Sequence, residues 1–172
     1  MTRRETVDVG GVPISYLTAG EPAPLVLLLH GTYWSRVWRP VLDEIATAGV
    51  RPVAVDFPGF GRSGGELTVA EASIPRLAAW LVRFLHAMGN DGPVMVAGHD
   101  IGGGVAQHLL ISRVVDVPRL ALVNAVMFDS WPRPWGCALP RSGGSRRDVD
   151  RGRCGRAPPI RDEGARRRGE RS

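Results

Sequence analysis

The stretch that decides the fold is Val94–Ala106, which reads VMVAGHDIGGGVA. Its first four residues form a short apolar run with the length and β-branching of a buried strand. The run ends at Gly98, and an apolar pattern with helical spacing follows from Gly102. This order predicts a strand, an abrupt turn centred on Asp100, and a helix.

Small residues flank this turn for steric reasons. A turn this tight strains the backbone of its central residue, and close packing of strand against helix leaves no room for a Cβ at Gly98 or Gly102. Strand, sharp turn and helix with glycines at these two places is the context of a nucleophile elbow. The central residue is an aspartate, Asp100, where most esterases carry a serine.

The rest of the first 132 residues alternates apolar strand patterns with helical ones. Such alternation predicts an α/β fold, a mostly parallel sheet of about six strands with helices on both faces. Pro75 is expected to interrupt or kink the helix that starts at the capping box of Thr68. The predicted strands are 6–9 and 12–18 (a hairpin at Gly10-Gly11), 25–29, 52–56, 94–97 and 120–123. The predicted helices run from Trp38 to Gly49, from Thr68 to Gly89 with a main body from about Arg76 to Met88 and Leu77, Trp80, Leu81, Phe84 and Leu85 inward, and from Gly102 to Ser112 with Val105, Ala106, Leu109 and Leu110 inward.

Charge divides the chain into two parts. Residues 1–132 hold ten arginines and twelve acidic residues, whereas residues 133–172 hold twelve arginines and five acidic residues. The second part lacks periodicity and is dominated by Arg, Gly, Pro and Ser, so we expect it to be a disordered tail. Because the basic excess belongs to the tail, it gives no reason to expect the predicted core, residues 1–132, to bind specific nucleic acid.

Several classes of function find no support in the sequence. Cys137 and Cys154 are too few for a disulfide framework or a metal site. No run approaches the ~20 apolar residues of a membrane helix, so a cytoplasmic location is expected. Residues 59–64 spell G-x-G-x-x-G, but Pro58 precedes them and no acidic residue ends a second strand at the distance a dinucleotide site needs. We therefore expect no cofactor, no metal and no membrane partner.

Three motifs in this order resemble the α/β-hydrolase fold family. His30-Gly31-Thr32 resembles the oxyanion loop after the third strand, residues 56–63 (DFPGFGRS) resemble the loop after the fourth, and residues 98–103 (GHDIGG) resemble the elbow after the fifth. An elbow with aspartate is similar to the branch that holds haloalkane dehalogenases, haloacetate dehalogenases and epoxide hydrolases. The resemblance covers about residues 6–131.

The resemblance implies nucleophilic catalysis by a carboxylate. Asp100 would attack an electrophilic carbon and form an ester, which a water activated by a His–acid pair would hydrolyse. The backbone N–H groups of Thr32 and Ile101 match the family's oxyanion hole. The alternative is that Asp100 only caps the helix that follows.

The substrate stays open between a halide, an epoxide and an ester, with carbon–carbon bond hydrolysis also possible. Ile101 stands where haloalkane dehalogenases place a tryptophan, and Tyr33 stands where epoxide hydrolases place a proline. Tyr33 and Trp34 are candidates for lining a substrate pocket beside the oxyanion loop. Plain packing is the alternative role for both aromatic side chains.

The catalytic set is incomplete in the sequence. Of the four histidines, His30 and His99 match structural positions of the family, and His86 and His108 fall on predicted helices. Asp129 is the nearest carboxylate to the expected place of the triad acid. We expect a truncated or frame-shifted hydrolase that is inactive alone. The alternative is a non-catalytic interaction protein whose basic arm binds polyanions.

Overall fold

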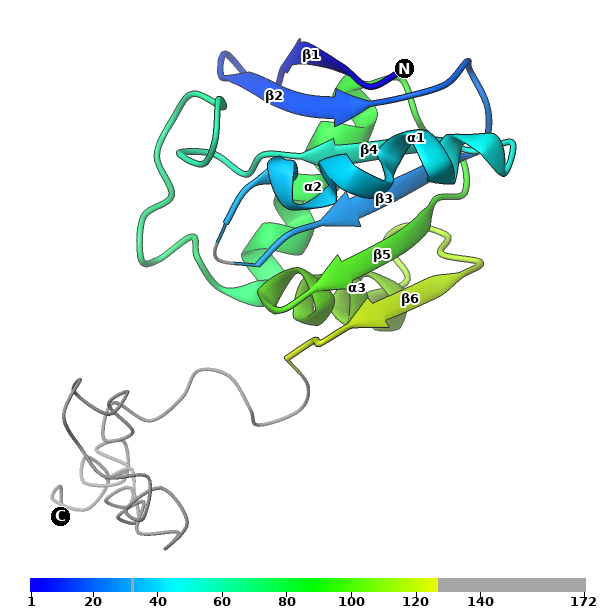
Figure 1. The fold of residues 1–172 in the computed structure, drawn as a ribbon. Helices are drawn as coiled ribbons and strands as arrows, with labels where there is room; N and C mark the ends of the chain where they lie inside the picture. Colours follow the sequence, from blue (N-terminus) through cyan, green and yellow to red (C-terminus); the bar gives the residue numbers. More distant parts are fainter. Residues whose placement is uncertain (32, 127–172) are drawn as a thin grey trace, which may run out of the picture. The chain divides into compact units, whose positions relative to one another are not determined.

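Six strands form one sheet in the computed structural model, in the order β1-β2-β4-β3-β5-β6 (Figure 1). The structure describes residues 1–31 and 33–126. β1 and β2 form an antiparallel hairpin, β2 is antiparallel to β4, and the remaining neighbours are parallel. The predicted α/β fold with a mostly parallel six-stranded sheet is confirmed. The strands are β1 (Arg3–Asp8), β2 (Pro13–Thr18), β3 (Leu25–Leu29), β4 (Arg51–Val55), β5 (Met95–His99) and β6 (Leu120–Val123).

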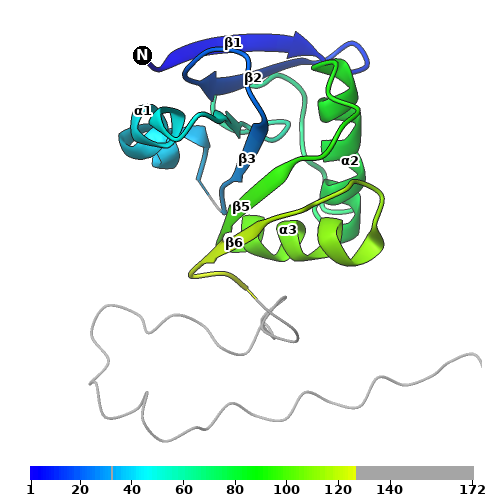
Figure 2. The same cartoon turned by 90° about the vertical axis from the view of Figure 1, so that its right-hand side faces the viewer.

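Helices cover both faces of the sheet. A short 3-10 helix, η1 (Ser35–Trp38), leads into α1 (Arg39–Thr47), which lies on one face. α2 (Ile74–Ala87) and α3 (Ile101–Ser112) lie on the other face, as the two views at right angles show (Figures 1 and 2). Each face therefore has its own apolar core. The larger core, under α2 and α3, includes Leu27, Leu29, Val53, Val55, Leu77, Trp80, Leu81, Phe84, Leu85, Val105 and Leu109, and the smaller one, under α1, includes Leu17, Leu28, Leu42 and Ala54.

The start of α2 differs from the prediction. Thr68 and Glu71 make the contacts of a capping box, with the Thr68 hydroxyl donating to Glu71 Oε2 at 2.7 Å. The helix nevertheless begins only at Ile74, and Pro75 occupies its first turn. Proline suits that place because its missing N–H would have no partner there. The predicted main body from about Arg76 to Met88 agrees with α2, and the structure has an interruption before Pro75 rather than a kink within the helix.

Strand register brings the predicted motifs together. In the parallel pair of β3 and β5, Leu29 lies opposite Gly98. The residues after β3 and after β5 therefore emerge side by side at the carboxyl edge of the sheet, which is where open α/β sheets bind ligands.

β6 lies at the end of the sheet. Among the described residues it pairs with β5 alone, and Leu122 and Val123 are 39% and 48% exposed. Leu110 on α3, which we expected to face the core, is 41% exposed. The opposite edge of the sheet is β1, which carries the charged residues Arg3, Arg4, Glu5 and Asp8.

Candidate active site

Asp100 occupies a strained turn between β5 and α3. Its backbone angles are φ 55° and ψ −124°, a conformation that residues with a Cβ rarely adopt. Its carbonyl oxygen accepts hydrogen bonds from the N–H groups of Gly103 (3.0 Å) and Val126 (3.1 Å). The turn is thus held from two sides, which keeps the strained backbone of Asp100 in place.

The glycines around the turn have the steric role that the sequence predicts. A Cβ on Gly98 would overlap the Gly102 carbonyl, and one on Gly102 would overlap the backbone of Leu29 and His30. Both obstacles are backbone atoms, which no side-chain rotation can move. Gly103 adds a contact that we did not predict, because a Cβ there would overlap Ala125.

The Asp100 carboxylate lies against Gly31, in the loop after β3. A Cβ built on Gly31 would overlap the Cβ, Cγ and Oδ2 atoms of Asp100. The side chain makes no capping hydrogen bond to α3. The alternative role of a helix cap therefore lacks the contact that defines it. Ile101 is the first residue of α3, where a backbone N–H has no acceptor within the helix.

His30 is a buried, neutral support of the same loop. Its Nδ1 lies 2.9 Å from the Gly31 carbonyl oxygen, so the ring donates Nδ1–H to that acceptor. The ring packs edge-on against Phe57 at 5.1 Å between centroids. Burial lowers the pKa of His30, and its buried Nε2 has no hydrogen-bond partner in the described part of the chain. The ring is enclosed, which agrees with a structural role.

A second carboxylate, Asp56 after β4, is fully buried and saturated with donors. Its Oδ1 accepts the Ser35 N–H at 2.6 Å, and its Oδ2 accepts the Arg62 N–H and an Arg4 guanidinium N–H, each at 3.1 Å. From the sequence we included Asp56 in the loop motif of residues 56–63 but predicted no role for its side chain. An acidic residue at the end of a buried strand was the signal for this anchor.

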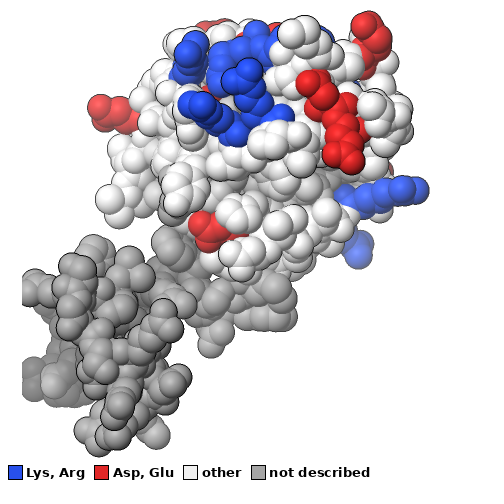
Figure 3. Space-filling model, viewed as in Figure 1, with Lys and Arg blue, Asp and Glu red and all other residues white. Residues whose placement is uncertain are grey.

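Of the two aromatic residues expected to line a substrate pocket, one is exposed and the other borders a different cleft. Tyr33 is 64% exposed. Trp34 borders a cleft lined by five arginines and by no residue of the elbow, and arginine side chains gather on this face in Figure 3. Thr32 and Asp129 lie outside the described residues. His86 is an exposed partner of Asp91, at 2.5 Å.

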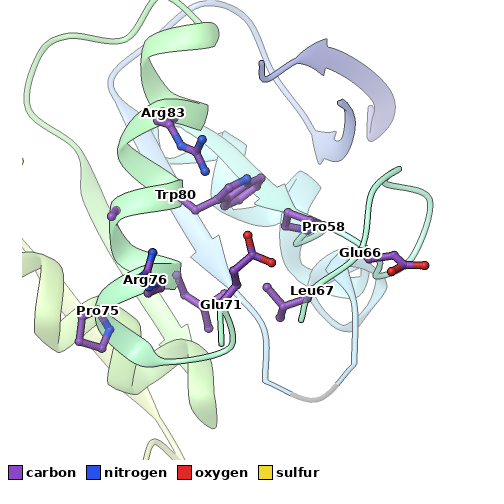
Figure 4. A pocket seen from close by; sticks show the side chains of 10 residues that line it. Pro58, Glu66, Leu67, Glu71, Pro75, Arg76, Trp80 and Arg83 are labelled. Atoms are coloured by element: carbon purple, nitrogen blue, oxygen red, sulfur yellow. The ribbon is translucent and has the colours of Figure 1, made fainter. Parts of the chain in front are cut away.

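A larger cleft, of about 600 Å³, lies between α2 and the loop after β4 (Figure 4). Trp80 and Leu67 provide apolar lining, and Arg83 and Glu71 provide charge. Asp100 is not among its lining residues, so this cleft and the elbow are different places on the molecule.

Comparison with known proteins agrees with this geometry. The family model of the alpha/beta hydrolase fold matches residues 24–148. The chain belongs to the α/β-hydrolase fold family. The match runs past the boundary that we predicted at residue 132, into residues outside the described part.

Individual relatives of this chain carry different activities in their names. The chain is 35% identical over 122 residues (70% of this chain, 32% of the relative) to the dihydrolipoyllysine-residue acetyltransferase component of the acetoin cleaving system of Cupriavidus necator. It is 35% identical over 129 residues (74% and 39%) to epoxide hydrolase A of Mycobacterium tuberculosis. A laboratory-evolved variant of potato epoxide hydrolase superposes with a TM-score of 0.64 at 31% identity, over 71% of this chain and 39% of that one.

The chain spans about a third to two fifths of the length of these relatives. Within the described residues, no helix is both long and apolar enough to cross a membrane.

Proposed function

We propose that this chain carries the nucleophile of a hydrolase and that the nucleophile is Asp100. A carboxylate oxygen of Asp100 would form a bond to an electrophilic carbon of a small organic substrate. In the same step the carbon–halogen or epoxide carbon–oxygen bond would break, and its electron pair would leave with the halide or the ring oxygen. The product is an ester between Asp100 and the substrate.

The observation that carries this proposal is the position of the Asp100 carboxylate. The strained turn presents it at the carboxyl edge of the sheet, it lies against Gly31, and no capping contact ties it to α3. A helix cap needs neither the strain nor the close approach of a glycine. A nucleophile needs both, since it must stand clear of its own helix and beside the oxyanion loop.

When water attacks the ester, negative charge would develop on the side-chain carbonyl oxygen of Asp100. We assign the stabilisation of that charge to the backbone N–H groups of Ile101 and Thr32. The N–H of Ile101 is free of an intrahelical acceptor because it opens α3, and the positive end of the helix dipole adds to its effect.

The hydrolytic water also needs a base, which we propose is missing from these 172 residues. The sequence holds no histidine after His108. His30 is enclosed and donates to Gly31, and His86 lies at the exposed end of α2. Without a base the ester intermediate should accumulate after one attack per chain.

A change of reading frame near the Trp135 codon is our proposal for the composition of residues 133–172. GC-rich DNA read out of frame yields the Arg, Gly, Ala and Pro that dominate there. Translation of the other two frames should then continue with helices, two further strands and a histidine. Two frames without such a continuation would contradict the frame-shift.

Trapping of the ester tests the nucleophile directly. The full chain is incubated with bromohexane and, separately, with styrene oxide, and its intact mass and peptide masses are measured. We expect one hexyl group on Asp100, and one styrene oxide addition if the epoxide is also a substrate. Turnover should not rise above background.

Two variants control this experiment. Asp100→Asn keeps the size of the side chain but loses the nucleophilic carboxylate, so the adduct should disappear. Asp116→Asn removes an exposed carboxylate and should leave the adduct unchanged. Alkylation spread over exposed carboxylates and cysteines, with none on Asp100, would contradict the proposal, and hydrolytic turnover that needs Asp100 would contradict the missing base.

A further inference from the structure

Five arginines line a second cleft, on the face of the sheet that α1 covers. The cleft has a volume of about 310 Å³ and lies between the β1–β2 hairpin, η1 and the loop after β4. Its arginines are five of the ten in residues 1–126, and they gather on the face shown in Figure 3. The lining residues are Thr2, Arg3, Arg4, Leu17, Trp34, Arg36, Arg39 and Arg62.

Two of these arginines have partners within the fold. Arg3 pairs with Glu5 at 2.6 Å, and Arg4 pairs with the buried Asp56 at 3.1 Å. No described carboxylate pairs with the other three, Arg36, Arg39 and Arg62. The described part of the cleft therefore keeps about three uncompensated positive charges.

The positions of two uncompensated arginines oppose the stability of α1. Arg39 is the first residue of this helix, Arg36 lies just before it, and the first turn has no acidic residue and no side-chain cap. Cations at the positive end of a helix dipole destabilise the helix, whereas an anion bound there stabilises it. Local sequence choices that oppose the fold are expected at functional sites.

Trp34 holds two of the guanidinium groups in place. The guanidinium carbons of Arg4 and Arg36 lie 5.9 and 6.0 Å from its ring centroid, within the range of cation–π attraction. The Thr2 hydroxyl, which also lines the cleft, is buried and has no hydrogen-bond partner among the described residues. Ordered cations and an unpartnered hydroxyl both favour a bound acceptor.

We propose that this cleft binds a diphosphate group. A diphosphate carries about three negative charges at neutral pH, which matches the uncompensated arginines, and its oxygens accept the forked N–H groups of guanidinium. The volume equals about ten water molecules at ~30 Å³ each, which is room for a diphosphate and ordered water. The ring of Trp34 already contacts two guanidinium groups and does not stack on a base. The cleft would therefore recognise the diphosphate itself and not a base attached to it.

Calorimetric titration of the full chain at 0.15 M salt, on the order of physiological ionic strength, tests the site. The probes are inorganic pyrophosphate, ADP, orthophosphate and adenosine. Pyrophosphate and ADP should bind at one site, and adenosine should not bind. ADP binding tighter than pyrophosphate would identify a nucleotide as the source of the diphosphate, and equal affinities would show that the site reads the diphosphate alone. Orthophosphate binding as tightly as pyrophosphate would overturn the assignment.

Matched variants separate this cleft from the other arginines, including the twelve in residues 133–172. The double variant Arg36→Gln, Arg39→Gln should weaken pyrophosphate binding by at least about tenfold, because charge-assisted hydrogen bonds are the strong ones. The double variant Arg113→Gln, Arg119→Gln removes the same charge from exposed positions elsewhere and should change the affinity less than about twofold.

Equal affinities of the two double variants would overturn the proposal, as would the absence of pyrophosphate binding to the unmodified chain. Thermal unfolding provides a separate readout. Pyrophosphate should raise the unfolding temperature of the unmodified chain, since a ligand that binds only the folded state stabilises it. The rise should be lost in the Arg36, Arg39 variant and kept in the Arg113, Arg119 variant.

Discussion

The carboxylate of Asp100 lies in the space that a side chain on Gly31 would fill. Gly31→Ala should therefore displace Asp100 or the oxyanion loop. We expect a loss of about 1–3 kcal/mol in the free energy of unfolding, the usual effect of overpacking. We also expect slower alkylation of Asp100 by bromohexane, measured by mass spectrometry, because the carboxylate leaves its position.

Gly92→Ala is the control for this substitution. A Cβ on Gly92 meets nothing within 4 Å. Its unfolding free energy and its rate of alkylation should match those of the unmodified chain. Alkylation of the Gly31→Ala variant at the full rate would show that Asp100 does not depend on this contact.

Substitution of Asp56 should lower the free energy of unfolding more than substitution of an exposed carboxylate. It is fully buried, and it satisfies Arg4 and two backbone N–H groups. Asp56→Ala leaves a partly buried guanidinium without its partner, which costs about 3–5 kcal/mol. Urea denaturation measures this loss. Asp43→Asn, at an exposed carboxylate, should change the unfolding free energy by less than about 0.5 kcal/mol, and equal effects of the two variants would contradict the anchor.

The sequence predicted the sheet well because most of its strands are continuous apolar runs. Leu25–Leu29 and Leu120–Val123 match their predicted bounds, since a short apolar run between turn signals is typical of a strand in a parallel sheet. The main body of α2 was predicted to within two residues of its start, whereas the capping box did not start a helix, because Thr68 and Glu71 make their local contact without a helix behind it.

The elbow was predictable and its surroundings were not. Gly98, Asp100 and Gly102 lie together in the chain, so their spacing alone indicates the turn. The anchor at Asp56 joins segments that are 21 and 52 residues apart in the sequence, those of Ser35 and Arg4. The arginine cleft likewise joins three separate segments, and no spacing rule reports such contacts.

His30 makes stability depend on pH. Burial lowers the pKa of this histidine below its ordinary value of 6.5. Below about pH 6.5 the unfolded chain binds a proton that the folded chain excludes, so the free energy of unfolding should fall as the pH falls, by up to ~1.4 kcal/mol per pH unit. Above about pH 6.5 neither the folded nor the unfolded chain protonates this histidine, so it no longer makes the free energy of unfolding depend on pH. Urea denaturation between pH 7.5 and 5.5, roughly one unit either side of the ordinary histidine pKa, measures it.

The matched variants for this test are His30→Gln and His86→Gln. The first should flatten the pH dependence, whereas the second removes an exposed ring and should leave it intact. An unchanged slope in His30→Gln would assign the pH dependence to other groups.

Tyr16 should stabilise the β1–β2 hairpin through its hydroxyl, which donates to Glu5 Oε2 at 2.6 Å. Burial, together with this hydrogen bond, raises the pKa of Tyr16 to about 12, and the same bond is the main cause that lowers the pKa of Glu5. Tyr16→Phe should cost about 1.5–3 kcal/mol at neutral pH, as for a hydrogen bond to a charged group.

The raised pKa of Tyr16 also predicts alkaline behaviour. Above about pH 10 the unfolded chain loses a proton that folded Tyr16 keeps, so stability should fall between about pH 10 and pH 12. Tyr16→Phe should weaken this fall. Tyr33→Phe, at an exposed ring, should retain it, and equal alkaline curves of the two variants would contradict the assignment.

The outer edge of β6, which pairs with no other described strand, should drive self-association. Unpaired backbone groups and exposed apolar side chains on an edge strand are a template for pairing with another chain. Val123 is 48% exposed on this edge. A lysine at this position would bring a charge against any strand that pairs with β6. Val123→Lys should reduce light scattering of the concentrated full chain.

Val69→Lys adds the same charge to a loop residue that is 96% exposed, and it should change the scattering much less. Equal improvement by both variants would assign the association to net charge rather than to the edge of β6.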